Sequence, residues 1–158
     1  MPDYKTHLFG GLGAYVILIC ALGRLCPSAA CGTEWLLFAL AGSLFPDVDI
    51  KSKSQQLFYL LLLVTALVIY SEKRYDLLPA LAVATFLPLL VKHRGLFHRL
   101  WFVLLATYAI WRTGSSVRPD LSMSLKYDML FFAAGAISHL WLDFGWRRML
   151  RIDKPPKR

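Results

Sequence analysis

Long apolar stretches alternate along the chain with short polar or charged connections. Apolar residues dominate six stretches, residues 6–23, 29–45, 56–71, 77–91, 96–111 and 127–144. Stretches of this length and composition predict helices that cross a membrane. The pattern therefore predicts an all-α fold, a polytopic membrane helix bundle of about six spans.

Several of these stretches are short for a hydrocarbon core, which needs about 20 apolar residues. The fifth is long enough only if its helix continues back through Arg99 and His98, and the sixth only if it includes His139. An ionisable residue inside a span is costly and usually faces a bundle interior or a wet cavity. We therefore expect these histidines within the helices, near one end. A soluble bundle of buried helices is the alternative.

The connections between the stretches lie at residues 51–54, 71–76, 92–95 and 112–126. The last is the longest, and Gly114, Ser116 and Pro119 predict a loop there. A basic segment follows the sixth stretch. The expected organisation is a membrane domain over residues 1–146 and a basic cytoplasmic tail over residues 147–158.

Composition supports the membrane class. Hydrophobic residues make up 57% of the chain and charged residues 18%, and the mean hydropathy is +0.50. Soluble globular chains have about 45–50% apolar and about 25% charged residues. The apolar excess runs through the whole chain, so a single anchor does not explain it. A nucleic-acid partner is not expected, because the basic residues are scattered between the spans except in the tail.

The placement of Lys and Arg predicts the orientation. With six alternating spans, the side that holds the N-terminus, the second and fourth connections and the tail has 12 of the 18 basic residues. Basic residues collect on the cytoplasmic side of membrane proteins. Both termini are therefore expected in the cytoplasm, in a multi-pass protein of the cell inner (plasma) membrane.

The same alternation places the unusual polar residues at one membrane face. Four histidines and three aspartates lie at the cytoplasmic ends of the predicted spans: His7, Asp47, Asp49, His93, His98, His139 and Asp143. The charge count made no use of the histidines, so the coincidence is independent support for one shared site. We expect a metal centre at the cytoplasmic face, with membrane lipid as a partner.

The spacing of the histidines suggests how they meet. His139 and Asp143 are four residues apart, so on a helix they share a face and can give two ligands to one metal. A neutral histidine capped by an aspartate is equally consistent with this pair. His93 and His98 do not share a face on a straight helix, but a turn at Gly95 would place His98 in the first turn of the fifth span. A solvated basic loop is the alternative.

Two carboxylates follow the second stretch. Pro46 is expected to end that helix and to extend the chain, so that Asp47 and Asp49 point the same way. Two adjacent carboxylates repel each other unless a cation or a proton lies between them. The alternative is a helix C-terminal turn in contact with interfacial water.

Four imidazoles and three carboxylates suit a divalent transition metal. This donor set fits zinc, manganese or iron better than calcium or magnesium, and we expect zinc first. Seven candidates are too many for one ion. They suit two ions about 3.5–4 Å apart, or one ion with an acid–base pair beside it.

The order of a histidine near the N-terminus, Pro-Asp-x-Asp, His-Arg-x-x-x-His and His-x-x-x-Asp resembles the YdjM-like inner-membrane proteins. These are described as membrane-bound metal-dependent hydrolases and more distantly look like zinc-dependent phospholipase C. The resemblance covers nearly the whole chain and implies a metal site made of His7, Asp47, Asp49, His93, His98, His139 and Asp143. It also implies Arg94 as a partner of the central motif. This chain departs from the pattern at Ile50, Phe97 and Arg99, where the family often has His, Thr and Ser.

The expected function is a metal-dependent hydrolase that acts on an amphiphilic (phospho)ester at the inner leaflet. Asp47 or Asp49 could act as general base, and Arg94 could bind a phosphate in a bidentate manner. A metal-binding membrane protein without catalysis and a metal-ion or proton transporter are the alternatives. The polar residues crowd at one end of the predicted spans, which counts against transport.

The three cysteines, Cys20, Cys26 and Cys31, lie in the first third of the chain. Cys20 is expected to pack as a small apolar residue. Whether Cys26 and Cys31 form a disulfide depends on the compartment that their connection faces, so the sequence leaves that pairing open.

Overall fold

A computed structural model describes residues 3–26, 28–48, 52–71, 73, 75, 78, 81–82, 85–86 and 96–150, without the side chains of residues 68 and 69. Over these residues the chain is helical and contains no strand, which confirms the all-α prediction. The fourth predicted stretch lies largely outside the described residues.

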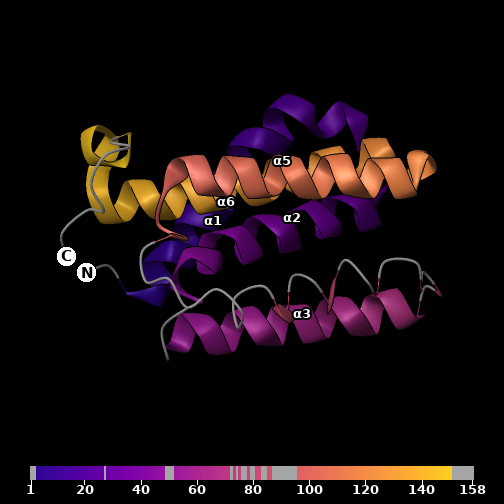
Figure 1. Ribbon diagram of the computed structural model, residues 1–158, viewed down its shortest axis with the longest axis horizontal. Helices are drawn as coiled ribbons and strands as arrows, with labels where there is room; N and C mark the ends of the chain where they lie inside the picture. The colour runs from indigo at the N-terminus through magenta and orange to yellow at the C-terminus, as the bar shows by residue number, and fades with distance from the viewer. Residues whose placement is uncertain are drawn as a thin grey trace.

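Five long helices and three short 3-10 turns are defined among the described residues. They are α1 (Tyr4–Leu22), η1 (Gly23–Leu25), α2 (Ala29–Leu44), η2 (Phe45–Asp47), α3 (Lys53–Ser71), α5 (Leu100–Val117), η4 (Pro119–Leu121) and α6 (Ser122–Met149). Helix α6 packs against α1, α2 and α5, and α2 also packs against α1 and α3 (Figure 1). The end of α2, the start of α3, the start of α5 and the last turns of α6 therefore lie at the same end of the bundle.

Side-chain caps explain where three helices begin. Asp3 accepts a hydrogen bond from the Tyr4 amide at 2.8 Å, and Ser28 accepts one from the Cys31 amide at 3.2 Å. Ser52 does the same for the amide of Gln55 at 3.2 Å. The first amides of a helix lack partners inside it, so each cap stabilises the start of its helix by about 1 kcal/mol.

The fifth helix corrects two predictions. It begins at Leu100, because Arg99 has an extended backbone (φ −103°, ψ 123°), so His98 lies in the preceding turn and not within the helix. It continues forward through Gly114 to Val117, so the loop predicted over residues 112–126 was wrong. Hydroxyl groups of this segment bond back to helix carbonyls, as Ser116 does to Arg112 at 2.9 Å. Only Arg118 and η4 separate α5 from α6.

The turn after α2 corrects a third prediction. Pro46 does not extend the chain, because Phe45, Pro46 and Asp47 form the 3-10 turn η2 and Val48 remains in the right-handed region (φ −70°, ψ −23°). Proline is tolerated in the first turn of a helix, where its missing N–H would have no partner in any case. The turn directs Asp47 back toward α6.

Helices α2 and α6 cross at two glycines. A Cβ atom on Gly42 would collide with the carbonyl oxygen of Phe132, and one on Gly135 would collide with that of Ala39. Glycine at both positions permits this backbone contact, because it carries no Cβ atom. This crossing brings Ser43 of α2 against His139 of α6.

Helix α6 changes direction just beyond the crossing. Gly145 has φ 68° and ψ 165°, a conformation that is essentially confined to glycine. The chain after this bend turns back, so that Met149 is buried in a cluster with Val103, Ala136 and Leu140. The bend is visible at the yellow end of α6 in Figure 1.

Two described segments are long and apolar enough to cross a membrane, Tyr4–Leu25 with 22 residues and Ala29–Asp47 with 19 residues. Both lie near the N-terminus. The three cysteines are free thiols in the structure, so the possible pairing of Cys26 with Cys31 is not formed.

Substitution of the crossing glycine tests the α2–α6 contact. Gly135→Ala should lower the free energy of unfolding by about 1–3 kcal/mol, because the new methyl group overpacks the interface. Gly13→Ala is the matched control: a Cβ atom there meets nothing within 4 Å among the described residues. It should be neutral or stabilising, since alanine favours a helix over glycine. Thermal unfolding in detergent measures both, and equal stability of the two variants would contradict the close crossing.

Candidate metal centre

Three separate segments bring four acidic and histidine side chains together. Asp47 comes from η2, His98 from the turn before α5, and His139 and Asp143 from α6. One ligand atom from each of the four lies within 4.8 Å of all the others. These are four of the seven residues that the sequence suggested for a metal centre.

The distances between ligand atoms in this group of four are close to those of a tetrahedral metal site. His98 Nε2 lies 3.3 Å from Asp47 Oδ1, and His139 Nε2 lies 3.3 Å from Asp143 Oδ2. The cross distances, His98 to Asp143 and His139 to Asp47, are both 3.8 Å. Ligand atoms around a tetrahedral zinc with bonds of about 2.0–2.1 Å lie roughly 3.3 Å apart. The group is therefore slightly wider than a zinc tetrahedron and can close on a small divalent ion.

A backbone carbonyl fixes the tautomer of His139. Its Nδ1 atom lies 2.7 Å from the carbonyl oxygen of Ser43. A carbonyl oxygen only accepts, so Nδ1 carries the proton and donates it, and Nε2 presents its lone pair to the carboxylates. Histidines that bind metals usually donate their other N–H in this way. His139 is fully buried, so little else competes for this hydrogen bond.

Two of the buried nitrogens need a partner. Among the described residues, His98 Nε2 and His139 Nε2 are buried and make no hydrogen bond. A buried polar atom without a partner costs about 1–3 kcal/mol, and native structures leave few of them. Both atoms face carboxylates across distances that suit a shared cation. The residues present therefore fit a divalent metal ion.

Asp47 is the most accessible member of the group. Its side chain is 20% exposed, whereas that of Asp143 is 7% exposed and that of His139 is fully buried. Its second oxygen, Oδ2, accepts a hydrogen bond from Ser54 of α3 at 3.5 Å. Solvent therefore reaches the group of four from the side of Asp47.

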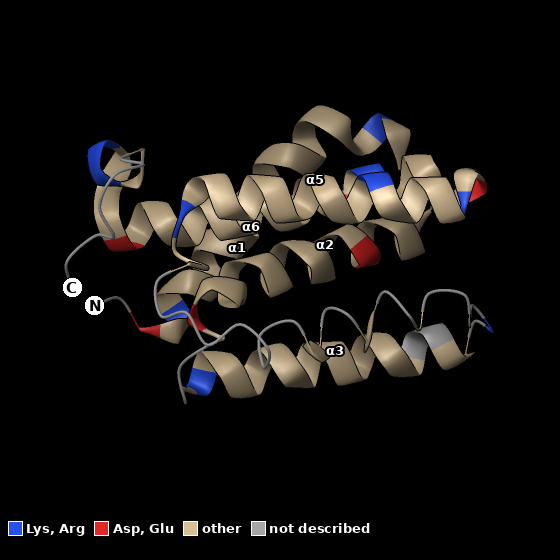
Figure 2. Cartoon of the chain, in the orientation of Figure 1, with Lys and Arg blue, Asp and Glu red and all other residues tan. Residues whose placement is uncertain are grey.

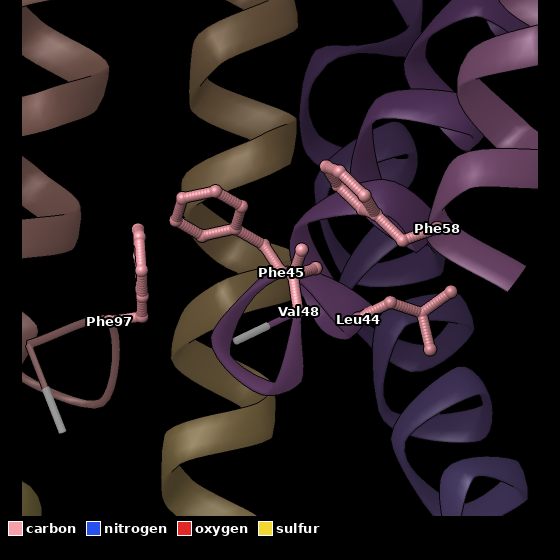
Figure 3. Packing of buried hydrophobic residues seen from close by; sticks show 5 residues of the cluster. All are labelled: Leu44, Phe45, Val48, Phe58 and Phe97. Atoms are coloured by element: carbon pink, nitrogen blue, oxygen red, sulfur yellow. The ribbon is translucent and has the colours of Figure 1, made fainter. Parts of the chain in front are cut away.

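A cluster of aromatic rings holds the segments that carry Asp47 and His98. Phe45 and Phe97 meet edge to face with their centroids 5.0 Å apart, and Phe58 of α3 lies 6.0 Å from Phe45. Figure 3 shows these rings gathered around η2 with Leu44 and Val48. Phe97 is the neighbour of His98, and Phe45 lies two residues before Asp47. The apolar contact thus fixes the distance between the two polar side chains.

His7 lies beside the group of four. Its ring stacks on His139, with the centroids 3.8 Å apart and the planes 17° apart. Its Nε2 atom lies 3.5 Å from Asp143 Oδ1, the oxygen that faces away from the other two histidines. His7 is 2% exposed.

The remaining predicted residues, Asp49, His93 and Arg94, lie outside the described residues, so their roles stay predictions. The sequence did not point to Ser43 or Ser54, which orient His139 and Asp47. The contribution of Ser43 comes from its backbone carbonyl, for which a sequence carries no signal.

Basic residues surround this end of the bundle. Lys and Arg lie near the starts of α1 and α3, before α5 and in the last turn of α6 (Figure 2): Lys5, Lys53, Arg99, Arg147 and Arg148. The side chains of the group of four come from the same end. The candidate metal centre and these five basic residues therefore share one end of the bundle.

Comparisons with known proteins locate the chain in a family. Neither the curated proteins nor the solved structures give a match. A family model described as YdjM inner membrane protein matches residues 1–152. The match includes every residue of the candidate metal centre and bears out the resemblance seen in the sequence motifs. The chain belongs to the YdjM family of inner membrane proteins.

Proposed function

We propose that this protein is a membrane-embedded, metal-dependent hydrolase that acts on an amphiphilic (phospho)ester at the inner leaflet. The observation that carries this proposal is the pair of buried imidazole nitrogens, on His98 and His139, that face carboxylates and have no other partner among the described residues. The partial exposure of Asp47 gives the site an open side. Catalytic metal sites keep such an open position, whereas structural sites are closed.

In this proposal the residues divide into ligands and a base. His98, His139 and Asp143 hold the ion, with zinc as the first candidate and manganese or iron as alternatives. A divalent ion held there would supply Lewis-acid chemistry, which lowers the pKa of bound water and polarises a phosphoryl or acyl oxygen. Asp47, the most exposed carboxylate, accepts a proton from the attacking water, while Ser54 holds its other oxygen. Asp49 as a further base and Arg94 as a phosphate-binding residue remain predictions from the sequence.

The surroundings of the site support an anionic, amphiphilic substrate. Five basic side chains, those of Lys5, Lys53, Arg99, Arg147 and Arg148, belong to the same end of the bundle as the site. Basic residues at a membrane surface attract anionic lipid headgroups by about 1 kcal/mol each. A phospholipid or a related phosphoester fits both this charge and the apolar helices.

The proposed topology is that of the sequence prediction, with about six spans and both termini in the cytoplasm. It is supported by two candidate spans among the described residues and by the 12 of 18 basic residues that the sequence assigns to the side of the termini. The basic segment of residues 147–158 would then lie at the cytoplasmic surface.

A structural metal site without catalysis is the second candidate. Four protein donors at near-tetrahedral spacing can close completely around an ion, as in structural zinc sites. The two candidates differ in the role of Asp47, which is a fourth ligand in one and a base in the other. Transport is disfavoured, because the described group of four lies at one end of its helices.

Metal content tests the ligand assignment. His98→Ala and Asp143→Asn should each weaken metal binding by more than the roughly 10–100-fold that the loss of a hydrogen-bonding neighbour costs. Asp120→Asn is the control, because Asp120 lies in η4 and pairs with Arg118 at 2.8 Å. The measurement is metal per protein after identical purification in detergent. Equal content in all variants would contradict a metal centre at these residues.

Turnover separates the two candidate functions. Asp47→Asn should keep the metal and lower the rate of phospholipid hydrolysis by about 10²–10⁴-fold, the usual contribution of a general base. Arg94→Ala should also keep the metal and reduce turnover, because a guanidinium has donors only and cannot be a ligand. The assay compares metal-loaded and chelator-treated protein on a panel of lipids. Loss of the metal in Asp47→Asn, with no hydrolysis by the wild type, would favour the structural site.

Reporter fusions test the orientation. A green fluorescent protein fused after Arg158 should fluoresce and alkaline phosphatase fused there should be inactive, because positive charge retains this end in the cytoplasm. Alkaline phosphatase fused within η4, at Asp120, should be active, since one span separates the two positions. The same result at both positions would refute the proposed topology.

A further inference from the structure

His7 contacts two members of the group of four but presents its nitrogen differently from them. The nearest atom to His7 Nε2 in the group is Asp143 Oδ1, at 3.5 Å. His98 and His139 instead face Asp143 Oδ2. The carboxylate of Asp143 therefore has an inner oxygen, Oδ2, toward the candidate ion and an outer oxygen, Oδ1, toward His7.

The stacking of the two rings excludes His7 as a ligand of the same ion. A metal bound to His139 Nε2 lies in the plane of the His139 ring, because the lone pair lies there. The ring of His7 is nearly parallel to that plane, with an angle of 17° and centroids 3.8 Å apart. The lone pairs of His7 lie in its own plane, so neither can reach that ion at a bond length of about 2.0–2.1 Å.

The other nitrogen of His7 indicates which atom carries the proton. Nδ1 is buried and has no hydrogen-bond partner among the described residues. If Nε2 bound a metal, Nδ1 would carry the proton and become a buried N–H without an acceptor, which is rare in native structures. If Nε2 carries the proton, it donates to Asp143 Oδ1, and Nδ1 is left with only an unused lone pair. Protonation at Nε2 therefore costs less free energy than protonation at Nδ1, because a buried lone pair without a donor is less unfavourable than a buried N–H without an acceptor.

The neighbouring glycines hold His7 in place. One turn after it, a Cβ atom on Gly10 would lie 2.7 Å from Leu142 Cδ1, and one on Gly11 would lie 2.6 Å from Ser43 Oγ. Helix α1 therefore approaches both α6 and α2 more closely than a larger residue allows. Gly11 meets the same serine whose carbonyl fixes His139.

We infer that His7 is a positioning residue of the metal centre and not one of its ligands. It donates from Nε2 to the outer oxygen of Asp143, which directs the inner oxygen to the ion, and its ring supports that of His139. This inference rests on the metal centre of the proposed function and differs from the family-based expectation that His7 is a ligand. Histidines and carboxylates next to metal ligands commonly orient them in this way.

Two variants of His7 distinguish the effect of its hydrogen bond to Asp143 from the effect of its ring stacking on His139. His7→Gln keeps an N–H donor near the position of Nε2 and removes the ring, whereas His7→Phe keeps a ring for the stack and removes the donor. The probe is Co²⁺ added to detergent-purified, metal-free protein, with binding followed by titration and by the visible spectrum. X-ray absorption gives the number of imidazoles per ion, and thermal unfolding without metal reports folding.

The expected result is a weaker Co²⁺ affinity in His7→Phe by about 10–100-fold, the usual cost of losing a partner of a metal ligand. His7→Gln should recover most of this loss. The ions per chain and the imidazoles per ion should be unchanged in both variants. A purely structural role would lower unfolding temperature without this difference between the variants.

A drop in imidazoles per ion or in ions per chain in both variants would show that His7 is a ligand and overturn the inference. Equal affinity in wild type and His7→Phe would overturn it as well. Wild-type protein that binds no Co²⁺ would refute the metal centre itself, and the proposed function with it. A metal-loaded wild type without hydrolysis would refute only the proposed function.

Discussion

The close crossing of α2 and α6 is the contact on which the candidate metal centre depends. Gly42 and Gly135 let the two backbones touch, and the carbonyl of Ser43 then reaches Nδ1 of His139 at 2.7 Å. That single hydrogen bond directs the lone pair of His139 toward Asp143 and Asp47.

The polar group is costly without an ion, and the rest of the structure keeps it together. The buried Nε2 atoms of His98 and His139 make no hydrogen bond among the described residues, which opposes folding when no cation is bound. The ring cluster of Phe45, Phe58 and Phe97 offsets part of this cost by burying apolar surface beside the site. An ion that bound the folded state alone would stabilise it further, and metal binding would then be coupled to folding.

The sequence predicted the structure well where a repeated pattern or a fixed spacing determines the fold. Apolar stretches located the ends of α1, α2 and α3 to within three residues, whereas those of α5 and α6 differ by four to six residues. The spacing of His139 and Asp143 placed both on one face of α6. The prediction from sequence failed at helix ends, where a glycine or a proline suggests a turn but neighbouring residues favour a helix. Gly114 alone suggests a turn, yet it lies within α5, where the lack of a Cβ atom lets Leu125 pack against the helix. Pro46 signalled a break, yet a 3-10 turn accepts it without cost.

The two carboxylates of the group of four are held in the same way, each with one oxygen toward a histidine of the group and the other toward a residue outside it. Asp47 faces His98 with Oδ1 and receives Ser54 of α3 on Oδ2, and Asp143 faces His139 with Oδ2 and His7 of α1 on Oδ1. In each case the outer oxygen contacts a helix that gives no member of the group of four. The described helices α1 and α3 thus orient the carboxylates, while the group of four itself comes from η2, the turn before α5, and α6. A sequence motif cannot tell a residue of the metal site from a residue that only orients a carboxylate, because the difference depends on which carboxylate oxygen the residue contacts.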